Sequence, residues 1–171
     1  MLQRRLVHMA SILLASAIIC SAACHQTVEP GSKYVATVDR GSMSPDGTML
    51  LRVDRILINN VRWLRFAIFD QSTGALLYQS PDKFQERLRN EFLWGAENRV
   101  WVNSSDVGIY YWQKTGDRKS WVKFTWIDDM VPVPEYLIKK DRFLDPKNNF
   151  YLREKLKEKG KDKVDIAITP P

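Results

Sequence analysis

Cysteine and histidine, the side chains that most often serve as nucleophiles, proton carriers and metal ligands, are nearly missing from this chain. Its 171 residues include two of each, and beyond residue 23 only the neighbours Cys24 and His25 remain. Two adjacent residues cannot form a Ser-His-Asp triad, a Cys-His dyad or a Cys- or His-based metal site within one copy of the domain. We therefore expect no catalytic residues of these classes, no metal and no disulfide.

Carboxylates are the remaining candidates for chemistry. Asp128 and Asp129 are adjacent, and Asp54, Asp70 and Asp106 are scattered along the chain. Adjacent side chains on a strand point to opposite faces, so the Asp128-Asp129 pair predicts a turn rather than an acid and base acting together. The sequence thus predicts a protein that is not an enzyme and needs no cofactor.

The first 23 residues have the pattern of a cleaved export signal. Arg4 and Arg5 begin it, residues 9–23 are uncharged and rich in Ile, Leu and Ala, and small residues precede Cys24. The apolar stretch has 15 residues, whereas a membrane-spanning helix needs about 18 to 20. A signal peptide is therefore favoured over a permanent transmembrane helix.

The segment Ser21-Ala22-Ala23-Cys24 resembles the bacterial lipobox. This resemblance implies that Cys24 carries lipid on its sulfur and, after cleavage, on its new amino group. His25 stands where inner-membrane retention signals favour Asp, so the resemblance implies an outer-membrane protein facing the periplasm, with residues 24–33 as a tether. Several acyl chains would make this membrane anchor effectively permanent. The same small residues also fit a cleavage site for ordinary secretion.

The positive charge of the mature chain is concentrated at its end. Residues 24–138 contain equal numbers of basic and acidic side chains, whereas residues 139–171 contain ten basic and six acidic ones. A basic face for anionic headgroups or an acidic partner is one interpretation, and a solvated helix with a frayed end is the other. Nucleic acid is not an expected partner, because the protein is exported and the aromatic residues of this tail are few and clustered.

Residues 34–138 have the rhythm of an antiparallel β domain. Turn residues recur about every 8 to 12 positions between segments rich in β-branched and aromatic residues. Asn59-Asn60 predicts a two-residue hairpin loop, and residues 80–91 fit either a short capped helix or an irregular crossover. The expected strands are 49–58, 61–70, 75–79, 92–94, 99–103, 107–114 and 120–127. The predicted fold is a small antiparallel β-sandwich or curved meander, followed by a short helix near residues 150–159.

Alternation along strand 61–70 separates two faces. Leu64, Phe66 and Ile68 share one face, which we expect to be core. Trp63, Arg65, Ala67 and Phe69 share the other, which we expect to be partly covered or exposed.

Aromatic residues are the candidate binding residues. All six tryptophans lie in the predicted β domain: Trp63, Trp94, Trp101, Trp112, Trp121 and Trp126. Trp101 and Trp112 alternate with valine, isoleucine and tyrosine residues that fit a core face, and Tyr110 belongs to the same aromatic run. Because Trp and Tyr anchor protein interfaces, we predict Trp101, Tyr110 and Trp112 as partner-binding residues. The alternative is that most of these rings fill a small core.

Ser44-Pro45-Asp46-Gly47 and residues 64–78 look like one blade fragment of a β-propeller, although residues 34–138 are too few for a complete propeller. A small turn-rich β domain behind a lipoprotein signal is similar to bacterial envelope lipoproteins that act as immunity proteins against type VI secretion toxins. The resemblance implies a protein that binds a cognate toxin and neutralises it by occlusion. A structural or assembly lipoprotein that docks another envelope protein is the alternative.

Overall fold

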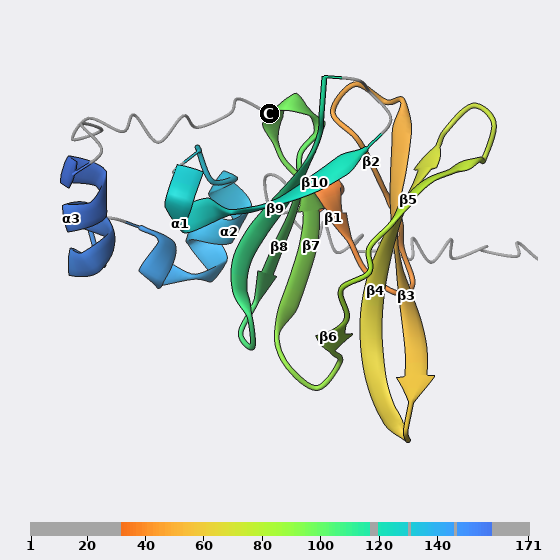
Figure 1. The fold of residues 1–171 in the computed structure, drawn as a ribbon, viewed down its shortest axis with the longest axis horizontal. Helices are drawn as coiled ribbons and strands as arrows, with labels where there is room; N and C mark the ends of the chain where they lie inside the picture. The colour runs from red at the N-terminus through yellow and green to blue at the C-terminus, as the bar shows by residue number, and fades with distance from the viewer. Residues whose placement is uncertain (1–31, 117–119, 130, 146, 159–171) are drawn as a thin grey trace, which may run out of the picture.

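Two antiparallel sheets and a group of short helices make up the part of the chain described by the computed structural model, residues 32–116, 120–129, 131–145 and 147–158 (Figure 1). The first sheet has the order β1-β7-β8-β9-β10; the second has the order β2-β3-β4-β5, with β6 paired to β4. The first sheet contains β1 (Val35–Ala36), β7 (Asn90–Trp94), β8 (Val100–Ser104), β9 (Gly108–Lys114) and β10 (Trp121–Thr125). The second contains β2 (Ser42–Met43), β3 (Met49–Ile58), β4 (Val61–Asp70), β5 (Leu76–Gln79) and β6 (Phe84–Gln85). The predicted mainly β, antiparallel class is confirmed.

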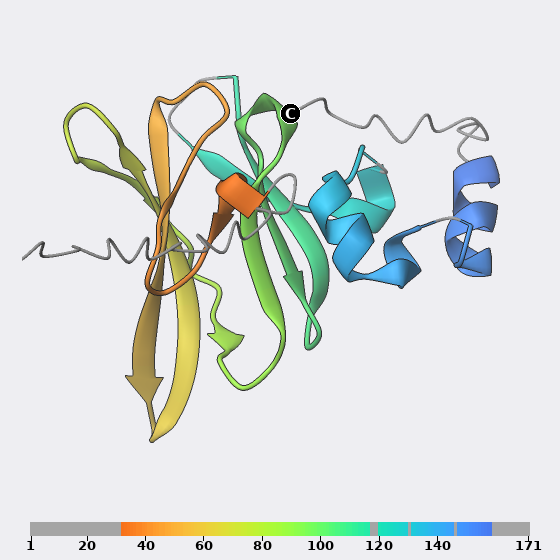
Figure 2. The ribbon, with the colours of Figure 1, turned by 180° about the vertical axis from the view of Figure 1, so that it is seen from behind.

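The hairpin of β3 and β4 is the longest regular element, and both views show it extending beyond the strands of the first sheet (Figures 1 and 2). Its register pairs Met49 with Asp70 and continues without a shift to Ile58 opposite Val61. The loop residues have positive φ angles, 49° at Asn59 and 61° at Asn60. Asparagine tolerates this left-handed conformation, which a two-residue hairpin loop requires. The hairpin predicted from the sequence is therefore confirmed.

One hydrophobic core lies between the two sheets. Alternate residues of β3 and β4 face it, and Phe66 meets Trp112 of the first sheet edge-on with a ring-centroid distance of 4.9 Å. The second sheet contributes Leu51, Val53, Leu64, Phe66 and Ile68, and the first contributes Phe92, Trp94, Val100, Val102, Trp112 and Trp121. Leu64, Phe66 and Ile68 thus form the core face predicted from their alternation.

A second core lies on the opposite face of the first sheet, under the helices (Figure 2). Leu93 of β7, Trp101 of β8 and Tyr111 of β9 share this cluster with Leu137. The helical elements are α1 (Trp126–Asp129), α2 (Glu135–Lys140), the 3₁₀ turn η3 (Arg142–Leu144) and α3 (Phe150–Glu158). The described fold is therefore a three-layer arrangement in which the first sheet is the middle layer.

The helical residues after 138 pack as part of this domain. Leu144 of η3 and both Leu152 and Leu156 of α3 are buried in the same cluster as Trp101. The predicted boundary between a β domain ending at 138 and a tail from 139 therefore does not coincide with a break in packing. The helix expected near residues 150–159 is α3, and it presents its leucines to this core.

Residues 80–91 adopt the irregular alternative. They contain the two-residue strand β6, turns and the first two residues of β7 rather than a helix. Phe84 of β6 is buried against Phe92 with a ring-centroid distance of 5.4 Å, so this segment closes one end of the sandwich core.

Candidate partner-binding surface

The predicted interface positions Trp101 and Trp112 are core residues. Each side chain is 1 % exposed, so the expectation that they lie on the surface is wrong. Alternation correctly places Trp101 and its neighbours Val100 and Val102 on opposite faces of β8. Both faces are covered, however, because the second sheet packs on one and the helices pack on the other. In this conformation neither tryptophan can touch a partner.

Tyr110 is half-buried at the side of the sandwich. Its ring lies 6.4 Å from that of Trp112, and the ammonium group of Lys123 lies 4.0 Å from its centroid. Lys123 also pairs with Asp82 of the β5–β6 connection at 2.8 Å, which joins the two sheets at this side. This arrangement gives Tyr110 a structural role in closing the sandwich.

Trp63 is the tryptophan that stays partly exposed. All six tryptophans lie in the described residues, and the other five are buried at 7 % exposure or less. Trp63 belongs to the face of β4 that points away from the first sheet, the face predicted to be partly covered or exposed. Strand periodicity does not single it out among the six tryptophans, although Arg62 directly before it and Arg65 two residues after it were an available signal.

The surface around Trp63 is called here the outer face of the second sheet. Cross-strand pairs define it, since Leu50 lies opposite Phe69, Arg52 opposite Ala67, and Ile56 opposite Trp63. Its members are Leu50, Arg52, Asp54, Ile56 and Ile58 of β3, Val61, Trp63, Arg65, Ala67 and Phe69 of β4, Leu76 and Gln79 of β5, and Gln85 of β6. A solvated sheet face is normally polar, so this mixture of aliphatic, aromatic and arginine side chains is unusual.

The outer face has few negative charges. Asp54 sits directly across from Arg65, while the guanidinium of Arg52 lies over the ring of Phe69 at 5.0 Å. The Nε of Arg65 is buried and has no hydrogen-bond partner among the described residues. Neither Arg52 nor Arg65 forms an ion pair within the described part of the chain.

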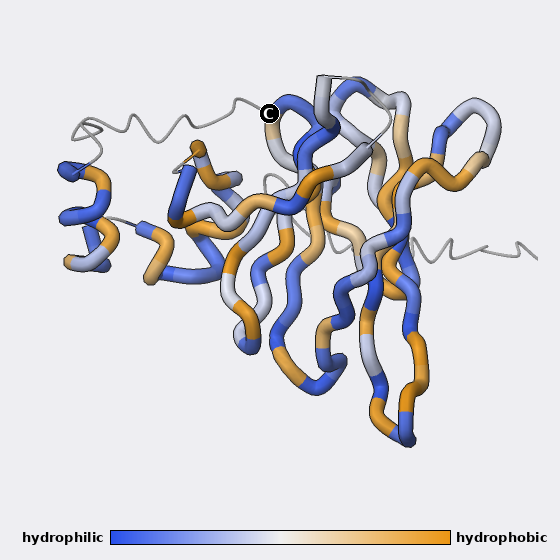
Figure 3. Tube along the Cα trace, in the orientation of Figure 1, coloured by the Kyte–Doolittle hydropathy of each residue, from blue (hydrophilic) through white to orange (hydrophobic). Residues whose placement is uncertain are grey.

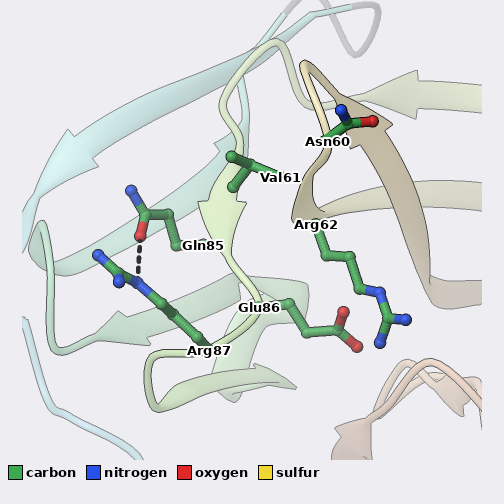
Figure 4. A pocket seen from close by; sticks show the side chains of 6 residues that line it. All are labelled: Asn60, Val61, Arg62, Gln85, Glu86 and Arg87. Carbon is green, nitrogen blue, oxygen red and sulfur yellow. Dashed lines mark hydrogen bonds between the residues drawn. The ribbon is translucent and has the colours of Figure 1, made fainter.

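A shallow open pocket borders this face where the start of β4 meets β6 and the turn after it (Figure 4). Val61 points into it, and Arg87 donates a hydrogen bond from Nε to Oε1 of Gln85 at 2.8 Å. Glu86 instead pairs with Arg55. Its lining residues are Asn60, Val61, Arg62, Gln85, Glu86 and Arg87. The pocket therefore combines an aliphatic side chain with a guanidinium group that one hydrogen bond already orients.

The hairpin tip adds exposed aliphatic side chains on both of its faces. Leu57 is 66 % exposed and Val61 is 42 % exposed. Hydrophobic segments flank the polar loop in the hydropathy view (Figure 3). These side chains extend the apolar surface beyond the edge of the sandwich.

Two of the carboxylates considered as catalytic candidates, Asp129 and Asp70, accept hydrogen bonds that hold local structure in place. Asp128 and Asp129 lie in α1, not in the predicted turn, and Asp129 accepts a hydrogen bond from the hydroxyl of Tyr111 at 3.1 Å. Burial, followed by this bond and the charge of Asp129, raises the pKa of Tyr111 to about 12. Asp70 accepts hydrogen bonds from Ser72 and Thr73, which lower its pKa to about 2.

Asp46 connects two loops. Partial burial opposes its ionisation, but hydrogen bonds from Ser44, Thr48 and Asn98 outweigh this effect and lower its pKa to about 2. The bond from Asn98 Nδ2 is 2.6 Å long and spans 52 residues of sequence. A strongly ionised, fully bonded carboxylate is a poor proton carrier, so the role of Asp46 is structural.

Lipid attachment, metal binding and membrane crossing are the remaining points raised by the sequence. Cys24, the predicted lipidation site, lies outside the described residues. Within the described ranges no group of three His, Cys, Asp or Glu side chains is arranged to hold a metal ion. No helix among the same residues is long and apolar enough to cross a membrane.

Comparison of the chain with protein-family models, with characterised proteins and with solved structures finds no match.

Proposed function

We propose that this protein binds a protein partner on the outer face of the second sheet. The observation that carries the proposal is Trp63, which is partly exposed beside Arg65 on the face of β4 that points away from the first sheet. The first sheet has no such free face, because the second sheet and the helices cover it. Partner binding is thereby moved from Trp101 and Trp112 to a different surface.

The composition of the outer face supports this proposal. Trp and Arg are enriched among the residues that dominate protein interfaces, and aliphatic side chains around them exclude water. Ile56 lies directly opposite Trp63 on β3, and Ile58 is two residues further along that strand, whereas Phe69 lies at the far end of the same face on β4; all three are half-buried. Burying this surface against a partner would remove the solvent-exposed part of these side chains from water.

The biological setting follows from the first 24 residues and remains part of the proposal. A lipid on Cys24 would hold the domain at the periplasmic side of the outer membrane. There the protein would neutralise a secreted antibacterial toxin by covering its active site or its route to substrate. The protruding β3–β4 hairpin supports this idea, because it offers an extended surface that can enter a concave site.

Site-directed photo-crosslinking in living cells of the host bacterium tests the proposal. A photoreactive residue replaces Val61, on the outer face, or Tyr151, which is 61 % exposed on α3 and serves as the matched control. We expect one specific adduct from position 61 and none from position 151. No adduct from position 61, or equal adducts from both positions, would contradict docking on this face.

Mass spectrometry of the adduct then separates the functions. A secreted antibacterial protein, together with loss of protection when the gene is deleted, supports toxin neutralisation. If the adduct instead contains a resident envelope protein, bound one to one, the same face has an assembly role.

A further inference from the structure

The charge of the outer face specifies the chemistry of what binds there. Three arginines, Arg52, Arg65 and Arg87, point to this side of the second sheet or to the pocket at its margin. Asp54 is the one acidic residue among the strand positions of the face, and the carboxylate of Glu86, which lines the same pocket as Arg87, is paired with Arg55. Resting on the proposed function, we infer that the partner presents an acidic protein surface, and that one of its carboxylates enters the pocket beside Val61 and binds Arg87.

Arg87 is prepared for this contact. The hydrogen bond from its Nε to Gln85 fixes the plane of the guanidinium, and the terminal nitrogens make no other hydrogen bond or ion pair within the described chain. A planar guanidinium binds a carboxylate through two parallel N–H···O bonds, and fixing it beforehand lowers the entropy lost on binding. Val61 supplies an apolar contact next to the guanidinium of Arg87.

Arg52 and Arg65 extend the positive charge along the sheet. Arg52 is exposed and its guanidinium lies over the ring of Phe69, so its N–H groups stay available to acceptors. The buried Nε of Arg65 has no hydrogen-bond partner among the described residues. The negative charge of a bound acidic side chain would offset the cost of leaving this group unpaired. The interleaving of these arginines with Trp63 and isoleucines fits a protein surface that has both acidic and apolar side chains.

A protein fits this face better than an anionic membrane. The apolar residues follow ten-residue strands, each about 33 Å long, and most of them are half-buried within the sheet. A membrane surface is bound by apolar side chains that protrude far enough to enter the headgroup region. The exposed aliphatic residues of the outer face, Val61 and Leu76, lie near opposite ends of β4 and so form no single protruding cluster. Leu57, the most exposed aliphatic residue of the described chain, belongs to the opposite face of the hairpin, where it lies across from Arg62.

Selection from a random twelve-residue peptide display library on the immobilised full chain tests the inference. We expect the wild-type chain to enrich peptides in which Asp or Glu adjoins an aliphatic or aromatic residue. A charge-reversed chain carrying Arg52→Glu, Arg65→Glu and Arg87→Glu should enrich Lys or Arg instead. A synthetic copy of a selected acidic peptide should lose at least tenfold in affinity with Arg87→Glu, and remain unchanged with Arg153→Glu on α3. Circular dichroism melts establish that each variant folds.

The possible failures are distinguishable. Peptides that lose binding with Trp63→Ala but lack acidic residues and ignore Arg87→Glu would overturn the acidic partner and leave the docking face intact. Peptides whose binding depends on neither Trp63 nor the arginines would overturn both proposals. Binding of phosphatidylglycerol vesicles that disappears on charge reversal, without selection of acidic peptides, would assign the face to a membrane. Sedimentation that reveals a dimer lost with Trp63→Ala would assign it to a second copy of the chain.

Discussion

The indole Nε1 of Trp94, on β7 of the first sheet, donates a 2.9 Å hydrogen bond to the carbonyl oxygen of Ser42, on β2 of the second. The two residues lie 52 positions apart and are both buried. The bond fixes the two layers relative to each other at one point inside an otherwise apolar interface.

Replacing Trp94 with Phe tests this connection. The variant loses the donor, leaves the buried Ser42 carbonyl without its partner and opens a small cavity, so we expect the free energy of unfolding to fall by about 2 to 3 kcal/mol. Urea denaturation measures the change. Trp63→Phe is the matched control because Trp63 is partly exposed, and it should cost less than about 1 kcal/mol. Equal losses would mean that the inter-sheet bond contributes little.

Gly95 is required by the ring of Trp101 rather than by its own backbone angle. A Cβ atom at position 95 would overlap the Nε1 and Cδ1 atoms of Trp101, which is itself buried under the helices. We expect Gly95→Ala to lower the free energy of unfolding by about 1 to 3 kcal/mol. Gly116→Ala is the control, since a Cβ atom there meets open space. A melting temperature unchanged by Gly95→Ala would show that the Trp101 ring is not packed as described.

Asp46 should make the free energy of unfolding fall as the pH is lowered through the acidic range. Its pKa is about 2 in the folded protein against an ordinary 3.8, so its stabilising contribution is present above pH 3.8 and disappears as pH falls through about 2. Allowing for solvent screening, Asp46→Asn should cost about 1 kcal/mol at pH 7, and this difference should vanish near pH 2. Denaturation of both proteins across this range checks the prediction. If the difference in stability between the wild type and Asp46→Asn did not change with pH, the charge of Asp46 would not be its cause.

The charge of Glu91 should lower the free energy of unfolding, whereas the charge of Asp46 raises it. Burial raises the pKa of Glu91, against the opposing effects of Arg89 and of a 2.9 Å hydrogen bond from Asn103. A raised pKa means that the folded state favours the neutral form, so the penalty for the charged form grows as pH rises above the ordinary value of 4.5. We expect Glu91→Gln to be more stable than the wild type at pH 7, with the advantage shrinking toward pH 4.5. A less stable variant at pH 7 would mean that the contact with Arg89 outweighs burial.

Local rules accounted for the hairpin and for the two faces of β4. The Asn59-Asn60 loop and the alternation of Leu64, Phe66 and Ile68 depend on residues close in sequence, and the structure follows both. Local rules could not predict that the second sheet and the helices cover both faces of the first sheet. This coverage depends on leucines such as Leu137 and Leu152 meeting Trp101 across long sequence distances, which strand periodicity does not encode. For the same reason periodicity alone could not rank Trp63 above the other tryptophans.

Trp63→Ala, assayed against the partner recovered by crosslinking from position 61, tests the central claim most directly. The measurement is the dissociation constant by calorimetry, with the melting temperature determined on the same samples and Tyr151→Ala as the control. We predict a loss of about 2 kcal/mol, roughly thirtyfold in affinity, with little change in melting temperature and no effect of Tyr151→Ala. Unchanged affinity in a folded Trp63→Ala variant would contradict docking on the outer face of the second sheet.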